Sequence, residues 1–171
     1  MKNNLNEKFL IVQAKKGDKE AFSQLIKQVE KRLFNVAYII NPEDAEDIVQ
    51  DTFLQAYSSI KKFKGKSSFY TWIYRIMMNL IYKKYKRKKI NFKKSIIKNE
   101  NNKDEELKEK LRIALTKLHP KFSQIITLFY FEDYSIKEIS EILNIKEGTV
   151  KSRIFKAKKY LKKFIEKNEP F

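Results

Sequence analysis

Cysteine is absent from this 171-residue sequence, and histidine occurs once, as His119. The chain therefore has no disulfide, no thiolate metal site and no cysteine nucleophile, and one histidine cannot build a zinc site alone. Glycine and proline are also scarce, at three residues each. Sheet proteins rich in tight turns, and glycine-rich loops that bind phosphate, need more of both. These absences favour a helical protein, for which we expect no catalytic residue, no metal site and no cofactor.

Long apolar stretches are missing as well. No run approaches the roughly 18 residues that a membrane-spanning helix needs, and the first residues lack the apolar core of a signal peptide. We therefore expect a cytoplasmic protein without direct membrane insertion. Hydrophobic residues still make up 42% of the chain, which is enough to bury a core.

The charge balance indicates the kind of partner. Lys and Arg number 38 against 21 Asp and Glu, which gives a net charge of +17. Basic residues exceed acidic ones both before and after residue 91. A surplus of this size says little about the fold, but it favours binding to nucleic acid or to another anionic surface.

Helical periodicity runs through nearly all of the sequence and predicts an all-α fold. The expected helices lie near residues 6–16, 18–39, 42–60, 68–89, 104–118, 120–131, 135–143 and 148–167. Residues 91–106 are polar and lack a sustained period, so we interpret them as a flexible linker. The sequence thus predicts two small helical domains, 1–90 and 107–171, the second with a helix-turn-helix.

Several helix ends carry local signals. Asn41 and Pro42 predict the start of the third helix, as N-cap and first helical residue. Ser135 with Glu138 has the spacing of a capping box, and Asn144 suits a left-handed residue that closes the helix. His119 is most simply a residue of an N-cap region.

Residues 135–165 have the pattern of a helix-turn-helix, because a short break at 144–148 separates two amphipathic helices. Nine basic and two acidic residues lie between 146 and 167. The face opposite the apolar stripe of the second helix holds Ser152, Phe155, Lys156, Lys159 and Lys163. Such a face suits DNA, since lysines bind phosphates while Arg, Ser and an apolar group read base edges. A solvated basic helix with Phe155 at its edge is the simpler alternative.

Residues 63–89 interleave aromatic and basic side chains. The expected helix buries Phe69, Ile73, Ile76, Met77 and Leu80, while Trp72 and Asn79 lie on a flanking strip with Lys83 and Lys86, and Arg75 and Tyr82 point outward. Aromatic rings stack on unpaired bases while cations follow the phosphate backbone, so the pattern suits an opened DNA strand. Core aromatics beside a solubilising charge run explain it equally well.

Residues 42–60 differ from the rest of this basic chain. One side is expected to bury Ala45, Ile48, Val49, Phe53, Ala56 and Ile60. The other side presents an acidic face with an apolar residue: Asp44, Asp47, Gln50, Asp51 and Leu54. Such a face repels DNA and suits a basic protein surface. The helix dipole accounts for Glu43 and Asp44 at the N-terminus, but not for Asp47 and Asp51.

In this combination and order, the three segments resemble those of bacterial extracytoplasmic-function (ECF) sigma factors, the minimal two-domain branch of the sigma-70 family. Residues 44–54 resemble the family's helix that binds core RNA polymerase. Residues 63–76, with Asn79, resemble its promoter-melting segment. Residues 135–161 resemble the helix-turn-helix that reads the −35 element.

The resemblance implies a function and partners. The chain would be a sigma factor without catalytic activity, which binds the β′ clamp helices and the β flap of core RNA polymerase and directs it to promoter DNA. Family members are usually held inactive by an anti-sigma factor, often membrane-bound, so we expect such a partner here.

The resemblance also implies site residues. The contacts with the β′ clamp helices would be Asp44, Asp47, Gln50, Asp51 and Leu54. The loop 64–68 would take a flipped-out −10 base, and the −10 contacts would be Lys64, Lys66, Ser67, Ser68, Trp72, Arg75, Asn79, Lys83, Lys86 and Arg87. The −35 contacts would be Thr149, Lys151, Ser152, Arg153, Phe155, Lys156 and Lys159.

The sequence departs from the family pattern in three ways. Lys83 stands where the family often has Asp, and His119 separates a Leu-Pro pair. Lysine also replaces most arginines. Because lysine cannot make a bidentate contact with guanine, discrimination at the −35 element would depend on Arg153 and on DNA shape.

Two other classes of function compete with this interpretation. A stand-alone helix-turn-helix regulator would need an effector or dimerisation domain, and the acidic face and the Trp72 segment argue against one. A nucleic-acid-processing enzyme would need paired carboxylates or a metal site. The sequence shows no paired-carboxylate, metal or nucleophile constellation, and although Asp44, Asp47 and Asp51 can be imagined as metal ligands, we do not favour that interpretation.

Overall fold

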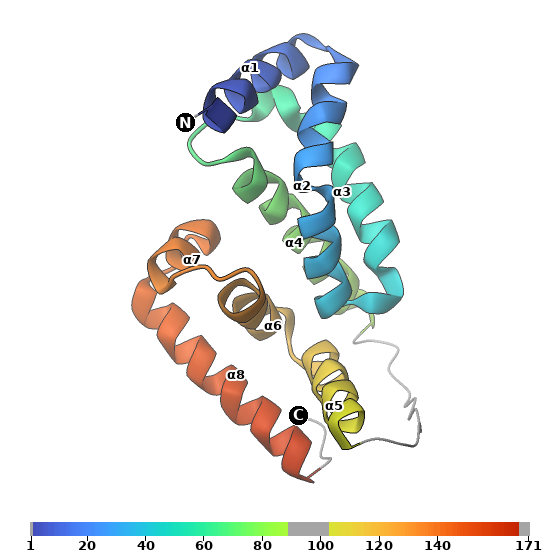
Figure 1. The fold of residues 1–171 in the computed structure, drawn as a ribbon, viewed down its shortest axis with the longest axis vertical. Coiled ribbons are helices and arrows are strands. Elements are labelled where there is room, and N and C mark those ends of the chain that lie inside the picture. Colours follow the sequence, from blue (N-terminus) through green and yellow to red (C-terminus); the bar gives the residue numbers. More distant parts are fainter. Residues whose placement is uncertain (1, 89–102, 168–171) are drawn as a thin grey trace. The chain divides into compact units, whose positions relative to one another are not determined.

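The computed structural model describes residues 2–88 and 103–167, and every regular element in these residues is helical. The chain divides into two compact units, Met1–Tyr38 with Glu43–Ile81 and Ile39–Pro42 with Tyr82–Phe171 (Figure 1). This confirms the predicted all-α, two-part architecture. The predicted domain limits at residues 90 and 107 stay predictions, and most of the predicted linker lies outside the described residues. Within the described ranges, no helix has the length and apolar character to cross a membrane.

The first unit is formed mainly by four helices joined by short connections. They are α1 (Lys2–Lys16), α2 (Lys19–Ile40), α3 (Ala45–Ser59) and α4 (Phe69–Lys88), with 3₁₀ turns at Pro42–Asp44 (η1) and Ile60–Lys62 (η2). Aromatic rings link three of these helices. The ring of Phe22 in α2 lies 5.1 Å from that of Tyr57 in α3 and 6.5 Å from that of Phe69 in α4. α1 packs against η2 and so joins the same core.

α4 buries a wider face than its periodicity predicts. Phe69, Ile73 and Met77 are buried as expected, whereas Ile76 and Leu80 are only half-buried. The additional buried residues are Tyr70, Tyr74, Met78 and Ile81. The guanidinium of Arg32 in α2 lies 4.1 Å from the ring centroid of Tyr70. Two rows of side chains are therefore covered on α4, which fixes the direction of its remaining face.

The start of α3 differs from the prediction. Pro42–Asp44 form a 3₁₀ turn, and the α-helix begins at Ala45. Asp44 occupies the N-cap position without a side-chain capping bond, so Asn41 is not the cap of this helix. A proline that starts a tight helical turn tolerates either geometry, because it has no N–H to place.

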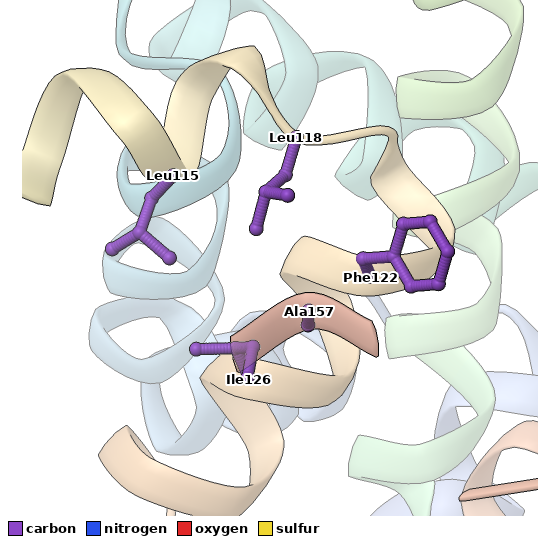
Figure 2. Close-up of a cluster of buried hydrophobic side chains, with 5 residues drawn as sticks. All are labelled: Leu115, Leu118, Phe122, Ile126 and Ala157. Atoms are coloured by element: carbon purple, nitrogen blue, oxygen red, sulfur yellow. The ribbon is translucent and has the colours of Figure 1, made fainter. Parts of the chain in front are cut away.

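The second unit is built around α8. Its regular elements are α5 (Lys103–Lys117), α6 (Pro120–Ile126), the π-helical turn η3 (Thr127–Phe131), α7 (Ile136–Leu143) and α8 (Glu147–Lys167). α8 packs against α5, α6 and α7. Figure 2 shows the centre of this packing, where Ala157 of α8 lies among Leu115, Leu118, Phe122 and Ile126. The predicted helix 120–131 is α-helical only to Ile126 and then widens into η3.

The predicted caps of the second unit are confirmed. The imidazole of His119 accepts a hydrogen bond from the Lys121 amide at 3.1 Å. Ser135 and Glu138 form a capping box, in which the Glu138 amide donates to Ser135 Oγ at 3.2 Å and the Ser135 amide donates to Glu138 Oε2 at 2.9 Å. Asn144 is left-handed, with φ of 52°, and ends α7. These caps set where the first helix of the helix-turn-helix begins and ends.

The capping box leads to a prediction about α7. Ser135→Ala should destabilise α7 by about 1 kcal/mol, because the Glu138 amide loses its acceptor. Amide hydrogen exchange across α7 should then be about fivefold faster at neutral pH.

Ser140→Ala on the same helix is the matched control, because Ser140 Oγ donates to the Lys137 carbonyl and caps no amide. The Ser135 hydroxyl hydrogen bond lowers the pKa of Glu138. The stabilising effect of the hydrogen bond between Ser135 and the Glu138 carboxylate is therefore present at neutral pH. This effect is lost as the pH falls through the lowered pKa of Glu138. Equal exchange rates in Ser135→Ala and Ser140→Ala at neutral pH would contradict the capping role.

Candidate protein and nucleic-acid interfaces

The predicted acidic face of α3 is largely on the surface. Asp47, Gln50 and Asp51 are exposed, Leu54 is 63% exposed, and Asp44 is half-buried. The opposite side of the helix is buried through Ala45, Ile48, Val49, Thr52 and Ala56. The exposed leucine one turn after Asp51 has the position that the sequence predicts for this face.

Burial of Thr52 was not expected from the sequence. Its hydroxyl donates to the Ile48 carbonyl at 2.6 Å, so the polar group is satisfied within the helix. Phe53, which was expected to be buried, is only half-buried. In the described part of the chain, no three histidine, aspartate or glutamate side chains are grouped as metal ligands.

The predicted base-binding loop lies between η2 and α4. Gly65 has φ of +67°, a conformation that residues with a side chain seldom adopt. Lys64, Lys66 and Ser68 are exposed and Ser67 is half-buried. Ser68 Oγ accepts from the Thr71 amide at 3.1 Å and so caps the start of α4. The loop therefore presents its lysines and hydroxyl groups beside a well-defined helix start.

Aromatic rings form the base of this loop. Phe63 and Phe69, at its two ends, are both buried, with ring centroids 6.3 Å apart. The ring of Trp72 lies 5.1 Å from that of Phe63 and 5.8 Å from that of Phe69. Trp72 is half-buried, so one part of the indole belongs to the core and the rest faces the surface. The predicted strip residue is thus also a packing residue.

The remaining predicted residues of α4 are exposed, and the structure brings them onto the uncovered side of the helix: Arg75, Asn79, Lys83, Lys86 and Arg87. Tyr82, which was expected to point outward, is half-buried instead. Within the second unit, its hydroxyl accepts a hydrogen bond from Gln124 Nε2 at 2.7 Å. Burial raises the pKa of Tyr82 to about 12, so the phenol is neutral at physiological pH.

Two residues of α1, to which the sequence assigned no role, contact both ends of the loop. Lys15 Nζ donates to the carbonyl oxygen of Phe63 at 3.0 Å. Glu7 Oε1 accepts from the amide of Phe69 at 3.3 Å. These pairs are 48 and 62 residues apart in the sequence, so no local pattern could have identified them.

The helix-turn-helix is confirmed in the second unit. α7 ends at Leu143, and the turn is closed by a hydrogen bond from the Ile145 amide to the Ser140 carbonyl at 3.0 Å. α8 then begins at Glu147, and α7 and α8 pack against each other. Val150 and Ala157 of α8 are fully buried.

The outward face of α8 is the predicted one. Its exposed residues are Lys151, Ser152, Phe155, Lys156 and Lys159, while Thr149 and Arg153 are half-buried. Phe155 is 71% exposed, although it belongs to an amphipathic helix with a covered apolar stripe. A large exposed aromatic side chain among lysines suits a partner that has both apolar and anionic groups. Duplex DNA has both, in its thymine methyl groups and its phosphates.

Known proteins resemble this chain over nearly its whole length. Residues 25–90 match the family described as sigma-70 region 2, and residues 108–161 match sigma-70 region 4. The ECF RNA polymerase sigma factor SigW of Bacillus subtilis is 31% identical over 90% of this chain and 93% of its own. The ECF RNA polymerase sigma-E factor of Haemophilus influenzae is 30% identical over 97% of this chain and 98% of its own. The chain belongs to the ECF branch of the sigma-70 family.

Two solved structures have the fold of this sigma factor. CnrH, in complex with the cytosolic domain of CnrY, superposes with a TM-score of 0.70 over 96% of this chain and 99% of that chain, at 23% identity. The sigma factor RpoE of Bartonella quintana, in complex with the anti-sigma factor NepR, gives a TM-score of 0.67 over 86% of this chain and 98% of that chain, at 22% identity.

The family matches divide the surfaces of this sigma factor between two regions. The region 2 match contains the acidic face of α3, the loop 64–68 and α4. The region 4 match contains α7 and α8 as far as residue 161, including the predicted −35 contacts. α1, with Glu7 and Lys15, lies before the first match.

Proposed function

We propose that this chain is a promoter-recognition subunit of bacterial RNA polymerase, which binds the core enzyme and directs it to promoter DNA. The observation that carries the proposal is that one basic chain combines an exposed acidic face on α3 with a basic helix-turn-helix. A stand-alone DNA-binding regulator uses the second feature and gives no role to the first. Membership of the ECF sigma family supplies the partner that the first feature needs.

The acidic face of α3 is proposed to bind the β′ clamp helices of core polymerase. Carboxylates at Asp47 and Asp51 complement a basic surface, and Leu54 can be buried in the contact. Asp44 and Gln50 complete the same face. Complementary charge raises the rate of association, while burial of an apolar side chain slows dissociation.

The loop 64–68 and the uncovered side of α4 are proposed to bind the opened −10 element. Lys64, Lys66, Ser67 and Ser68 line the loop that takes the flipped-out base. The exposed part of Trp72 offers a stacking surface beside it. The strand backbone is held by the remaining polar and basic residues: Arg75, Asn79, Lys83, Lys86 and Arg87.

α8 is proposed to read the −35 element in the major groove. Ser152, Arg153 and Phe155 suit base edges and thymine methyl groups, whereas Lys151, Lys156 and Lys159 suit phosphates. Thr149, near the start of α8, is proposed to contact the DNA backbone through its hydroxyl or the amide groups around it. The second unit is further proposed to contact the β flap.

An anti-sigma factor is the proposed regulator. CnrH and RpoE, which share this fold, were each solved with a protein partner, and NepR is an anti-sigma factor. If this partner is membrane-anchored, the partner and not the sigma factor would respond to the inducing signal. The sigma factor would work in the cytoplasm without inserting into the membrane and without catalysis of its own. Residues 1–90, 91–106 and 107–171 are proposed as its first domain, linker and second domain.

The direct test is reconstitution. The purified chain, mixed with core polymerase and a genomic template, should produce transcripts whose start sites share one −35 and one −10 sequence. Core polymerase alone is the control. Starts that are scattered and unchanged by the added chain would contradict the proposed function.

The acidic face yields a second prediction. Asp47→Lys with Asp51→Lys should weaken binding to core polymerase by at least about tenfold, because each attractive pair becomes a repulsive one. The fold should persist, since both side chains are exposed. Affinity is measured by fluorescence anisotropy with labelled core polymerase, and helicity by circular dichroism.

Glu20→Lys with Glu30→Lys is the matched control, because it makes the same change in net charge at exposed positions of α2. This variant should bind core polymerase like the wild type. If the α3 variant binds as well as this control, the acidic face is not the polymerase contact.

The third prediction separates base contacts from phosphate contacts on α8. Arg153→Ala in the holoenzyme should lower the preference for the −35 sequence by about 1–3 kcal/mol, the range for a bidentate contact with a base. Lys159→Ala should weaken binding to all sequences alike and flatten the salt dependence by about one unit.

The measurement compares promoters with native and scrambled −35 elements at two salt concentrations. Arg153 is half-buried, so packing within the domain is the alternative to base reading as the role of its side chain. Arg153→Lys keeps the charge and the long side chain without the planar fork. If Arg153→Ala and Arg153→Lys both leave the −35 preference unchanged, Arg153 does not read bases.

A further inference from the structure

α1 holds the loop 64–68 at both of its ends. The carbonyl oxygen of Phe63, just before the loop, accepts from Lys15 Nζ at 3.0 Å. The amide of Phe69, just after the loop, donates to Glu7 Oε1 at 3.3 Å. Both bonds involve a charged group and are stronger than bonds between neutral partners. Both side chains are half-buried, so water competes with them less than at an open surface.

The two anchors come from one rigid element. Glu7 and Lys15 are eight residues apart in α1, which is about two turns or 12 Å along the axis and leaves both on one side of the helix. Leu10 and Ala14, on the intervening turns, are buried, and α1 packs against η2 directly before the loop. Because both bonds come from one helix, α1 sets the separation of the two loop ends.

Hydrogen bonds within the loop lie at its C-terminal end, where Ser67 Oγ donates to the Ser68 carbonyl at 3.3 Å and Ser68 Oγ donates to Thr71 Oγ1 at 3.0 Å. Gly65 lowers the stiffness of the loop, and Lys64 and Lys66 repel each other. Ser68 caps the Thr71 amide, which fixes the start of α4 but not the part of the loop before it. Phe63 and Phe69 are buried beneath it, and this packing positions side chains rather than the backbone groups. The two bonds from α1 satisfy those backbone groups.

We propose that Glu7 and Lys15 are positioning residues that set the base specificity of the loop 64–68. This inference rests on the proposed −10 role of that loop. Neither residue has to touch DNA: each fixes one loop end, and an end that is free to move lets the loop accept several bases with similar affinity. The effect should be confined to the −10 element, because the helix-turn-helix is in the other unit.

Paired substitutions test the two bonds separately. Lys15→Met removes the donor and keeps the apolar stem, whereas Lys15→Arg keeps a donor. Glu7→Ala removes the acceptor, whereas Glu7→Gln keeps an oxygen that can accept. Lys16→Met and Glu30→Ala are the controls for charge alone, because both residues are exposed and lie outside these bonds.

The holoenzyme is assayed on the promoter that reconstitution identifies. Each −10 base is substituted in turn, and discrimination is the ratio of single-round transcript yields from the native and substituted promoters. Lys15→Met and Glu7→Ala should lower the highest −10 ratio about tenfold, the effect of losing one charged hydrogen bond, and leave the −35 ratio unchanged. Lys15→Arg and Glu7→Gln should recover most of it, and the two controls should equal the wild type.

Two measurements on the free protein show whether the loop itself has moved. Trp72 is the single tryptophan of the chain and packs on both loop-end phenylalanines, so its fluorescence reports loop order. The Phe69 amide should exchange faster in Glu7→Ala, while the amides of Leu10 and Ala14 in α1 should exchange as in the wild type. Faster exchange at all three amides would show that α1 unfolds in Glu7→Ala. The positioning role is then judged from Glu7→Gln, which should recover most of the −10 ratio.

The outcomes distinguish the inference from the proposed function. If the wild type discriminates among −10 bases and both deletion variants keep that ratio, the positioning role is wrong. If Lys16→Met loses the ratio as Lys15→Met does, the effect is one of charge and the inference is also wrong. If the wild type shows no discrimination at any −10 base, the proposed role of the loop fails, and the inference fails with it.

Discussion

The first unit depends on one constraint: α4 packs one side in the core and presents its other side on the surface. Phe69, Ile73 and Met77 recur at four-residue spacing and are excluded from solvent, so one side of the helix cannot turn away from the core. Asn79 and Lys83 then have to face outward, because the 100° step per residue leaves them no other direction. The loop before α4 inherits this orientation, since Phe69 is both its last anchor and the first residue of the helix. Core packing thus sets the direction of the surface that is proposed to meet DNA.

Charge is distributed to keep two kinds of partner apart. The chain has a net charge of +17, and yet the exposed side of α3 is acidic. Asp47 and Asp51 would weaken any DNA surface they belonged to, and on α3 they would repel nucleic acid from the proposed protein contact. Leu54 adds an exposed apolar group, which gains nothing from contact with DNA phosphates. The sign of the surface therefore selects the class of partner before any detailed fit.

Local signals made most of the fold predictable from the sequence. The capping box at Ser135 and the left-handed Asn144 depend on residues within a few positions of one another, and the structure confirms both. Of the apolar stripe expected on α8, Val150 and Ala157 are buried, whereas Ile154, Leu161 and Phe164 are half-buried. The same signals identified which residues of α3 and α8 are exposed, because periodicity settles the face of an amphipathic helix once its core side is known.

Errors arose where tertiary packing overrides a local pattern. Burial of Thr52 is tolerated because its hydroxyl is satisfied within its own helix, and Tyr82 is covered by a contact with a residue 42 positions away, which periodicity does not reveal. The anchoring of the loop by Glu7 and Lys15 is the clearest case. These bonds join residues 62 and 48 positions apart, and the charged side chains of α1 look like ordinary solvated residues in the sequence. Tertiary packing, including that of α1 against η2, brings them to the loop.

The scarcity of arginine limits how this sigma factor can recognise a promoter sequence. Arg153 is the one arginine of α8, and lysines fill most of the other basic positions. Lysine contacts with phosphates supply affinity that carries no sequence information. A single weakly selective surface would be lost among the many competing sites of a genome. Two such surfaces bound to one polymerase multiply their preferences, because engagement of the first raises the effective concentration of the second. The proposed polymerase contact on α3 would therefore be part of the reading mechanism, since it would hold the proposed −35 and −10 surfaces to the same stretch of DNA.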